Sequence, residues 1–174
     1  IESSNSFPHS AGIASSASAM SALALCLNSI AAERDGSIHE LTDVERVSHF
    51  ARLGSGSASR SVAGPVMLWG KAPELEGSSD EYALPVKDVV PVFNSYLDSI
   101  LIVSDKEKQV KTSAGHELMK GHPYANKRFD TARARIGVVL EILKNGDVHA
   151  FGRMAEQEAM DLHAMMMSST PPYL

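Results

Sequence analysis

A run of small and hydroxyl-bearing residues at positions 8–20 has the composition of an anion-binding helix start. Gly12 permits backbone conformations that other residues resist, and small neighbours let a ligand approach the main chain. The hydroxyls of Ser15 and Ser16 can donate hydrogen bonds to phosphate oxygens. If a helix begins near Ile13, its unpaired N–H groups and positive dipole end face the same anion. Flexible linkers share this composition, and a helix cap also explains a serine, so the run alone leaves these interpretations open.

A second run of the same kind, at residues 54–61, contains a guanidinium. Arg60 follows Ser57 by three residues, which places a charge and a neutral donor in one loop. A guanidinium binds a carboxylate or phosphate through two parallel hydrogen bonds. The alternative is a surface ion pair; Gly54 and Gly56 argue against it, because an ion pair needs no permissive backbone beside it. The two runs together predict a single polyanionic ligand.

The sequence does not contain several other catalytic patterns. The seven histidines lack metal-ligand spacing, and no acidic or thiol cluster joins them, so no metal ligands are predicted. Neither Gly-x-Ser-x-Gly nor a Walker Gly-Lys-Thr/Ser sequence occurs, which gives no support to an acyl-transfer triad or a P-loop.

The composition is that of a soluble globular protein, with 44% hydrophobic and 21% charged residues among 174. Its net charge of −5, with scattered lysines and arginines, argues against nucleic-acid binding. No apolar run is long enough to span a bilayer, so membrane insertion is not expected. The single cysteine, Cys26, cannot form an intrachain disulfide, which suits a cytoplasmic protein.

Apolar periodicity predicts the elements that position the two runs. We expect a helix over residues 13–32, buried on several sides because apolar residues cover most of its circumference. A second helix follows, capped by Thr42 or Asp43. Strands at residues 61–69 and 82–86 then predict a hairpin.

The second half of the sequence predicts a buried strand followed by helices. The continuous apolar run at residues 98–104 is typical of a central strand buried on both faces. Three helices are expected after it, at residues 112–120, 126–143 and 147–167.

The two runs resemble the motifs of a known enzyme family. The pattern Pro-x-x-x-Gly-x-x-Ser-Ser-Ala at positions 8–17 resembles the phosphate-binding motif of the GHMP small-molecule kinase superfamily. Paired with residues 51–61, it is similar to the diphosphomevalonate decarboxylase family. The sequence Asn-Ser-Phe-Pro at 5–8 and the segments 101–105 and 163–172 fit that family in the same order. The resemblance therefore covers nearly the whole chain.

The resemblance implies an α+β GHMP kinase fold that is truncated at both ends. Residues 1–90 would be the remainder of the N-terminal nucleotide-binding domain, which is ribosomal-S5-domain-2-like. Residues 91–174 would be an incomplete ferredoxin-like domain, with the junction between residues 87 and 96. The family also implies a homodimer in the cytoplasm.

The activity that the resemblance implies is the decarboxylation of 5-diphosphomevalonate to isopentenyl diphosphate, dependent on ATP and Mg²⁺, in the mevalonate pathway of isoprenoid biosynthesis. The residues expected to bind the ATP phosphates are Gly12, Ser15 and Ser16. Those expected to hold the substrate are Ser55, Ser57, Arg60, Thr112 and Ser113. Arg60 would be the catalytic residue, because a fixed cation can align the carboxylate that is about to leave.

The sequence also departs from the family pattern. His9 stands where threonine is frequent, and Ala-Gly-Pro at 63–65 replaces an aromatic residue followed by two glycines, which would reshape the pocket. The family's catalytic aspartate is expected after Leu174 and its substrate-binding lysine before Ile1, so this piece alone is expected to be inactive. A mevalonate 3-kinase, a phosphomevalonate decarboxylase and a non-catalytic GHMP-fold anion binder stay open as alternatives.

Overall fold

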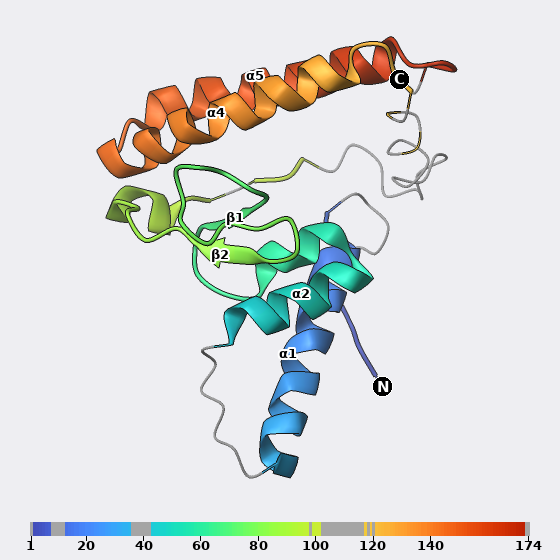
Figure 1. Cartoon of the computed structure of the whole chain (residues 1–174), viewed down its shortest axis with the longest axis vertical. Helices are drawn as coiled ribbons and strands as arrows, with labels where there is room; N and C mark the ends of the chain where they lie inside the picture. Colours follow the sequence, from blue (N-terminus) through green and yellow to red (C-terminus); the bar gives the residue numbers. More distant parts are fainter. Residues whose placement is uncertain are drawn as a thin grey trace. The chain divides into compact units, whose positions relative to one another are not determined.

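The computed structural model describes residues 2–7, 13–35, 43–97, 99–101, 117, 119 and 121–172. The chain divides into two compact units, one containing Ile1–Lys87 and the other containing Asp88–Leu101 and the C-terminal helices. Helices and one small sheet make up the described part (Figure 1), which agrees with an α+β class. The domain junction expected between residues 87 and 96 stays a prediction. The identity of the units as GHMP and ferredoxin-like domains stays a prediction.

The first unit is built on two helices, α1 (Ser15–Asp35) and α2 (Val44–Gly54), that pack through small side chains. Alanine dominates the buried cluster, which lets the two helix backbones approach closely. Asp43 caps α2 as expected, since its carboxylate accepts a hydrogen bond from the Arg46 N–H at 3.2 Å. The buried cluster consists of Ala17, Ala24, Val47, Ala51 and Ala58.

Helix α1 differs from the expectation of burial on several sides. Its C-terminal turns extend beyond α2 (Figure 1), and the side chains of Leu27 and Ile30 are 55% and 60% exposed. The stretch Ser15–Arg34, with a mean hydropathy of 1.3, also has the length and composition of a membrane span, so the expectation that no apolar run is long enough is wrong. Core helices share these properties, and Ala17 and Ala24 of α1 do pack into the buried cluster.

A 3-10 helix and a hairpin follow α2. The 3-10 helix η1 (Gly56–Ser61) leads to β1 (Met67–Trp69), which pairs antiparallel with β2 (Ala83–Pro85) so that Leu68 lies opposite Leu84. The expected hairpin is confirmed. Its first strand is shorter than residues 61–69, because η1 takes up the start of that range and Gly64 turns the chain with φ +62° before Met67.

The side chain of Ser48 joins α2, η1 and β2 at the centre of this unit. It is fully buried, its hydroxyl donates to the Ser59 carbonyl at 2.8 Å, and it accepts from the Ala83 N–H at 2.7 Å. Buried backbone groups need such partners, since an unpaired one costs free energy. Ser48 therefore fixes η1 against the second strand of the hairpin.

We predict that Ser48→Ala lowers the free energy of unfolding by about 1–3 kcal/mol, because it leaves a buried carbonyl and a buried N–H without partners. The matched control is Ser29→Ala on α1, whose exposed hydroxyl bonds only to the Leu25 carbonyl. This control should stay within about 0.5 kcal/mol of the parent. Urea unfolding measures both, and equal effects of the two variants would contradict the assignment.

The second unit contains η2 (Pro91–Ser95) and the helical hairpin of α4 (Ala125–Asn145) and α5 (Val148–Met167). Gly146 ends α4 in the left-handed conformation with φ +79°, where glycine carries no steric penalty. The Asp147 carboxylate then caps α5 by accepting from the Ala150 N–H at 2.8 Å. The last two expected helices are thereby confirmed to within three residues at their boundaries.

The central strand expected at residues 98–104 is wrong for the part that is described. Residues 99–101 form no strand, and Leu101 is 89% exposed. A strand becomes buried on both faces only inside a sheet, and the only sheet among the described residues has two strands, β1 and β2. Residues 98 and 102–104 lie outside the described part. Of the helix expected at 112–120, only Glu117 and Met119 are described, and both are helical.

Arginines of α4 pair with carboxylates of α5. Arg128 contacts Glu158 at 2.5 Å, and Arg135 contacts both Glu158 and, at 2.6 Å, Asp161. Hydrogen bonds from Arg135 and then Gln157 lower the pKa of Asp161. Burial raises the pKa of Glu158, but the hydrogen bonds and charges of Arg135 and Arg128 outweigh burial and lower it overall.

These ion pairs predict a loss of stability in acid. Each carboxyl has a lower pKa folded than unfolded, so the stabilisation is complete above the ordinary values of 4.5 for Glu158 and 3.8 for Asp161 and is lost as pH falls through the lowered values. Glu158→Gln should be less stable than the parent at pH 7, and its melting temperature should fall less than that of the parent on acidification. Thermal melting across this pH range measures the difference, with the exposed Glu156→Gln as control. A parent melting temperature that does not change in acid would count against the pairs.

Candidate functional site

The first turn of α1 has the geometry of an anion-binding helix start. The Ser18 N–H donates to the Ala14 carbonyl at 3.1 Å, so the N–H groups of the residues between them have no partner within the helix. Ala14 itself has φ +57°, a left-handed conformation that costs an alanine about 1–2 kcal/mol. Strain of this kind is typical of functional turns. It brings the chain into α1 so that Ser15 and Ser16 lie in its first turn.

The structure brings the two hydroxyl-rich runs together. The Ser16 and Ser55 hydroxyl oxygens lie 3.2 Å apart and share a hydrogen bond, although 39 residues separate them in the chain. Ser55 lies between the end of α2 and the start of η1, which carries Ser57 and Arg60. The start of α1 and the start of η1 therefore form one polar surface.

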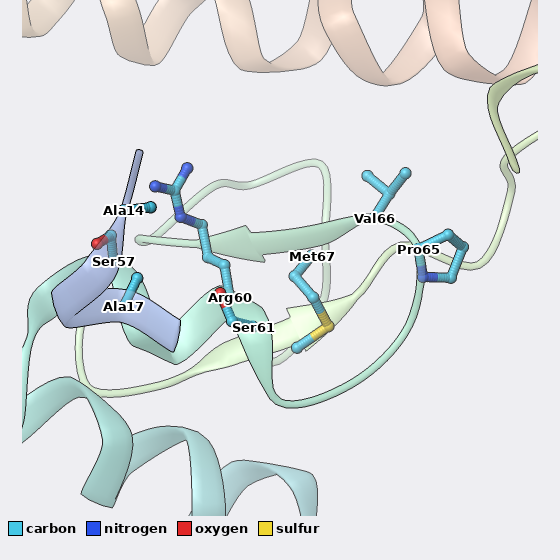
Figure 2. A pocket seen from close by; sticks show the side chains of 8 residues that line it. All are labelled: Ala14, Ala17, Ser57, Arg60, Ser61, Pro65, Val66 and Met67. Carbon is cyan, nitrogen blue, oxygen red and sulfur yellow. The ribbon is translucent and has the colours of Figure 1, made fainter. Parts of the chain in front are cut away.

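A cavity of about 350 Å³ lies beside this surface (Figure 2). Arg60 extends from η1 toward Ala14 in the close view, and Ser57 contributes its hydroxyl. Within the described part of the chain, no hydrogen bond or ion pair engages the Arg60 guanidinium, so the surface ion pair considered from the sequence is not present there. The lining residues are Ala14, Ala17, Ser57, Arg60, Ser61, Pro65, Val66 and Met67.

A second cavity, of about 500 Å³, touches the first turn of α1 as well. Ser15 lines it, and the Ser15 hydroxyl is inaccessible to solvent and has no hydrogen-bond partner. Nearby, the Ser18 hydroxyl donates to the Asn5 side-chain oxygen at 3.1 Å, which ties the N-terminal segment to α1. The lining residues are Ser3, Ser4, Asn5, Phe7, Ser15 and Ala19. The hydroxyl of Ser15 thus lacks a hydrogen-bond partner within the described part of the chain.

The glycines of the second run are required by close packing and not by a permissive backbone. A Cβ on Gly54 would lie 2.4 Å from the Met20 sulfur, and one on Gly56 would lie 2.9 Å from the Trp69 ring. The structure records neither glycine with a left-handed φ. Close packing therefore explains both glycines without a permissive backbone or a ligand, and the expectation drawn from them is wrong, although Ser57 and Arg60 do line the cavity.

The predicted site residues are only partly described. Ser15, Ser16, Ser55, Ser57 and Arg60 lie around the two runs as given above, while Gly12, Thr112 and Ser113 lie outside the described residues. The binding roles of all eight stay predictions. Sequence reasoning missed the apolar wall formed by Val66 and Met67, because apolar residues in a predicted strand carry no signal that separates a cavity wall from a core.

The described part of the chain contains no cluster of potential metal ligands. No three or more His, Cys, Asp or Glu side chains lie close enough there to hold an ion. The donors at the site are hydroxyls, helix N–H groups and one guanidinium, and this set fits the oxygens of phosphates and carboxylates.

Comparisons with known proteins show what the chain is similar to. Residues 1–83 match the family model described as "Diphosphomevalonate decarboxylase-like N-terminal domain". The match covers slightly less than half of the 174-residue chain. The diphosphomevalonate decarboxylase of Ganoderma lucidum is 30% identical over 99% of this chain and 41% of its own length. The enzyme of Eremothecium gossypii is 31% identical over 99% of this chain and 42% of its own length.

Solved structures are also similar to this chain in fold. A mevalonate diphosphate decarboxylase from Legionella pneumophila matches with a TM-score of 0.71 and 27% identity, over 95% of this chain and 48% of its own. The protein called MDDEF, solved in complex with MVAPP, AMPPCP and magnesium, matches with a TM-score of 0.67 and 26% identity, over 95% of this chain and 48% of its own. The chain spans less than half the length of these relatives.

Close packing at Gly54 predicts the effect of adding a methyl group. Gly54→Ala should lower the free energy of unfolding by about 1–3 kcal/mol, because the new Cβ overlaps Met20. Gly152→Ala is the matched control: it has open space around its Cβ within α5, so it should raise the free energy of unfolding by about 0.5–1 kcal/mol. Chemical denaturation distinguishes the opposite signs, and a neutral Gly54→Ala would show that Met20 does not pack there.

Proposed function

We propose that this chain is part of an enzyme that decarboxylates 5-diphosphomevalonate to isopentenyl diphosphate, with ADP, phosphate and carbon dioxide as the other products, in the mevalonate pathway. The observation that carries the proposal is the Arg60 guanidinium, which has no partner among the described residues and lies in a cavity beside the first turn of α1. The relationship of nearly the whole chain to diphosphomevalonate decarboxylases supports it.

In the proposed arrangement, Arg60 binds the substrate carboxylate through two parallel hydrogen bonds, and Ser55 and Ser57 donate to the substrate. A carboxylate held in this way stays aligned with the bond that breaks when carbon dioxide leaves. Val66 and Met67 line the same cavity, so they would contact the hydrocarbon part of the substrate. Thr112 and Ser113 would contact its diphosphate.

The start of α1 is the proposed site for the nucleotide phosphates. The solvent-inaccessible Ser15 hydroxyl lacks a partner, and the helix N–H groups beside it add donors that fit a phosphate group. Ser16 and Gly12 complete the proposed loop. ATP supplies the phosphoryl group that the tertiary hydroxyl of the substrate accepts before phosphate and carbon dioxide leave.

Magnesium is proposed as the second cofactor, since the related MDDEF complex contains it together with MVAPP and AMPPCP. Among the described residues no acidic cluster lies at the site, so the ion would rely on phosphate oxygens and on residues elsewhere. A homodimer in the cytoplasm is also proposed, from the family resemblance alone. The proposed GHMP fold has its nucleotide-binding domain in residues 1–90 and a ferredoxin-like domain in residues 91–174.

The role of Arg60 is tested by removing its charge in the full-length protein. Arg60→Ala should lower turnover of diphosphomevalonate by about 100-fold or more, because the carboxylate loses its positioning partner. Its melting temperature should stay close to that of the parent, since the side chain is exposed and makes no hydrogen bond or ion pair with the described residues. The exposed Arg153→Ala on α5 controls for loss of one positive charge.

Two product assays separate the alternatives in the same preparation. Release of both ADP and carbon dioxide from diphosphomevalonate supports the decarboxylase, whereas ADP without carbon dioxide supports a kinase relative. A folded protein that forms neither product from mevalonate or its phosphates contradicts both enzymes and leaves the anion binder. A melting temperature that collapses in Arg60→Ala, with normal kinetics in the folded remainder, would make Arg60 a structural residue.

A further inference from the structure

We propose that Trp69 is a positioning residue that holds the start of η1, and with it Ser57 and Arg60, in the geometry that binds an anion. The inference rests on the proposed function of the cavity that these two residues line. Trp69 itself is not among the residues that line the cavity, so it acts through η1.

The indole ring of Trp69 lies against the backbone of Gly56, the first residue of η1. A Cβ built on Gly56 would come within 2.9 Å of the Cη2 atom and 3.3 Å of the Cζ3 atom of the ring. The hydrogen atoms of Gly56 therefore face the ring directly, and no larger residue fits between them. Gly56 cannot move toward β1 without overlapping Trp69.

The ring is in turn fixed by the loop between the two strands. Its Nε1–H donates to the Asp80 carbonyl at 2.8 Å, and the Asp80 carboxylate accepts from the Lys71 N–H at 3.1 Å. The Gly70 N–H closes the base of the loop by donating to the Ser79 carbonyl at 2.9 Å. The indole is therefore held at both its polar and its apolar end.

These contacts fix the short helix at two points. Trp69 holds Gly56, and the buried Ser48 hydroxyl holds the Ser59 carbonyl. Ser57 lies between these points and Arg60 follows directly after the second. Because no described residue bonds to the Arg60 guanidinium, its position depends on the backbone of η1. A shift at Gly56 would therefore displace Ser57 and tilt the turn that carries Arg60.

The experiment measures the affinity of the full-length protein for 5-diphosphomevalonate, whose carboxylate Arg60 is proposed to hold, by calorimetry in the parent and three variants. Trp69→Leu removes the ring and should weaken binding about tenfold, in keeping with the cost of a small displacement of a binding group. Trp69→Phe ends short of the Cη2 and Cζ3 positions that contact Gly56 and lacks the Nε1–H, so it should weaken binding as well. Leu25→Ala, on α1 and two turns beyond the cavity-lining Ala17, destabilises the same unit and should leave the affinity unchanged.

Melting temperatures are recorded for all four proteins, and binding is measured where each is folded. The positioning role is supported if the parent binds and Trp69→Leu loses affinity while Leu25→Ala does not. Equal affinity in parent and Trp69→Leu, or an equal loss in Leu25→Ala, overturns that role and leaves the proposed function standing. A parent protein that does not bind 5-diphosphomevalonate contradicts the proposed function itself, and the role of Trp69 is then rejected with it.

Discussion

The buried hydroxyl of Ser48 is the interaction on which the candidate site depends. It satisfies a carbonyl of η1 and an N–H of β2 at once, at 2.8 and 2.7 Å, in a place that solvent does not reach. A hydroxyl is suited to this task because it donates and accepts from one atom. Arg60 comes one residue after the carbonyl that Ser48 holds. The direction in which the guanidinium leaves the backbone therefore depends on a hydrogen bond inside the core, far from any ligand.

Close packing is the second constraint, and it explains why the run at residues 54–61 looks like a phosphate loop. Gly54 makes room for Met20 and Gly56 makes room for Trp69, so both glycines serve contacts between elements of the protein. A phosphate loop needs glycine so that a ligand can approach the backbone, whereas this junction needs glycine so that side chains can. Both requirements produce the same composition, and only the structure separates them.

What could be predicted from the sequence is what depends on neighbours along the chain. The cap at Asp43, the turn at Gly146 and the ends of α4 and α5 follow from local hydrogen bonding and backbone freedom. The exposure of Leu27 on α1 and the absence of a strand at residues 99–101 depend on which elements lie beside them, and apolar periodicity does not contain that information. The same distinction holds for the candidate site. The hydroxyls and the guanidinium could be predicted from residue type alone, whereas the apolar residues Val66 and Met67 could not.

The attraction of an anion to this site must be local. The net charge of −5 repels a polyanion at long range, and salt screens charges that are more than about 8–10 Å apart. At the proposed site, binding would therefore depend on short contacts: the first-turn N–H groups of α1, the hydroxyls of Ser15, Ser16, Ser55 and Ser57, and Arg60. Hydrogen bonds of this kind lose strength steeply with distance and angle, which is why they require a rigid backbone. The strained turn at Ala14, the bond between Ser16 and Ser55 and the contact of Gly56 with Trp69 supply that rigidity. The affinity of the proposed site would therefore come from the packing of the first unit as much as from its charge.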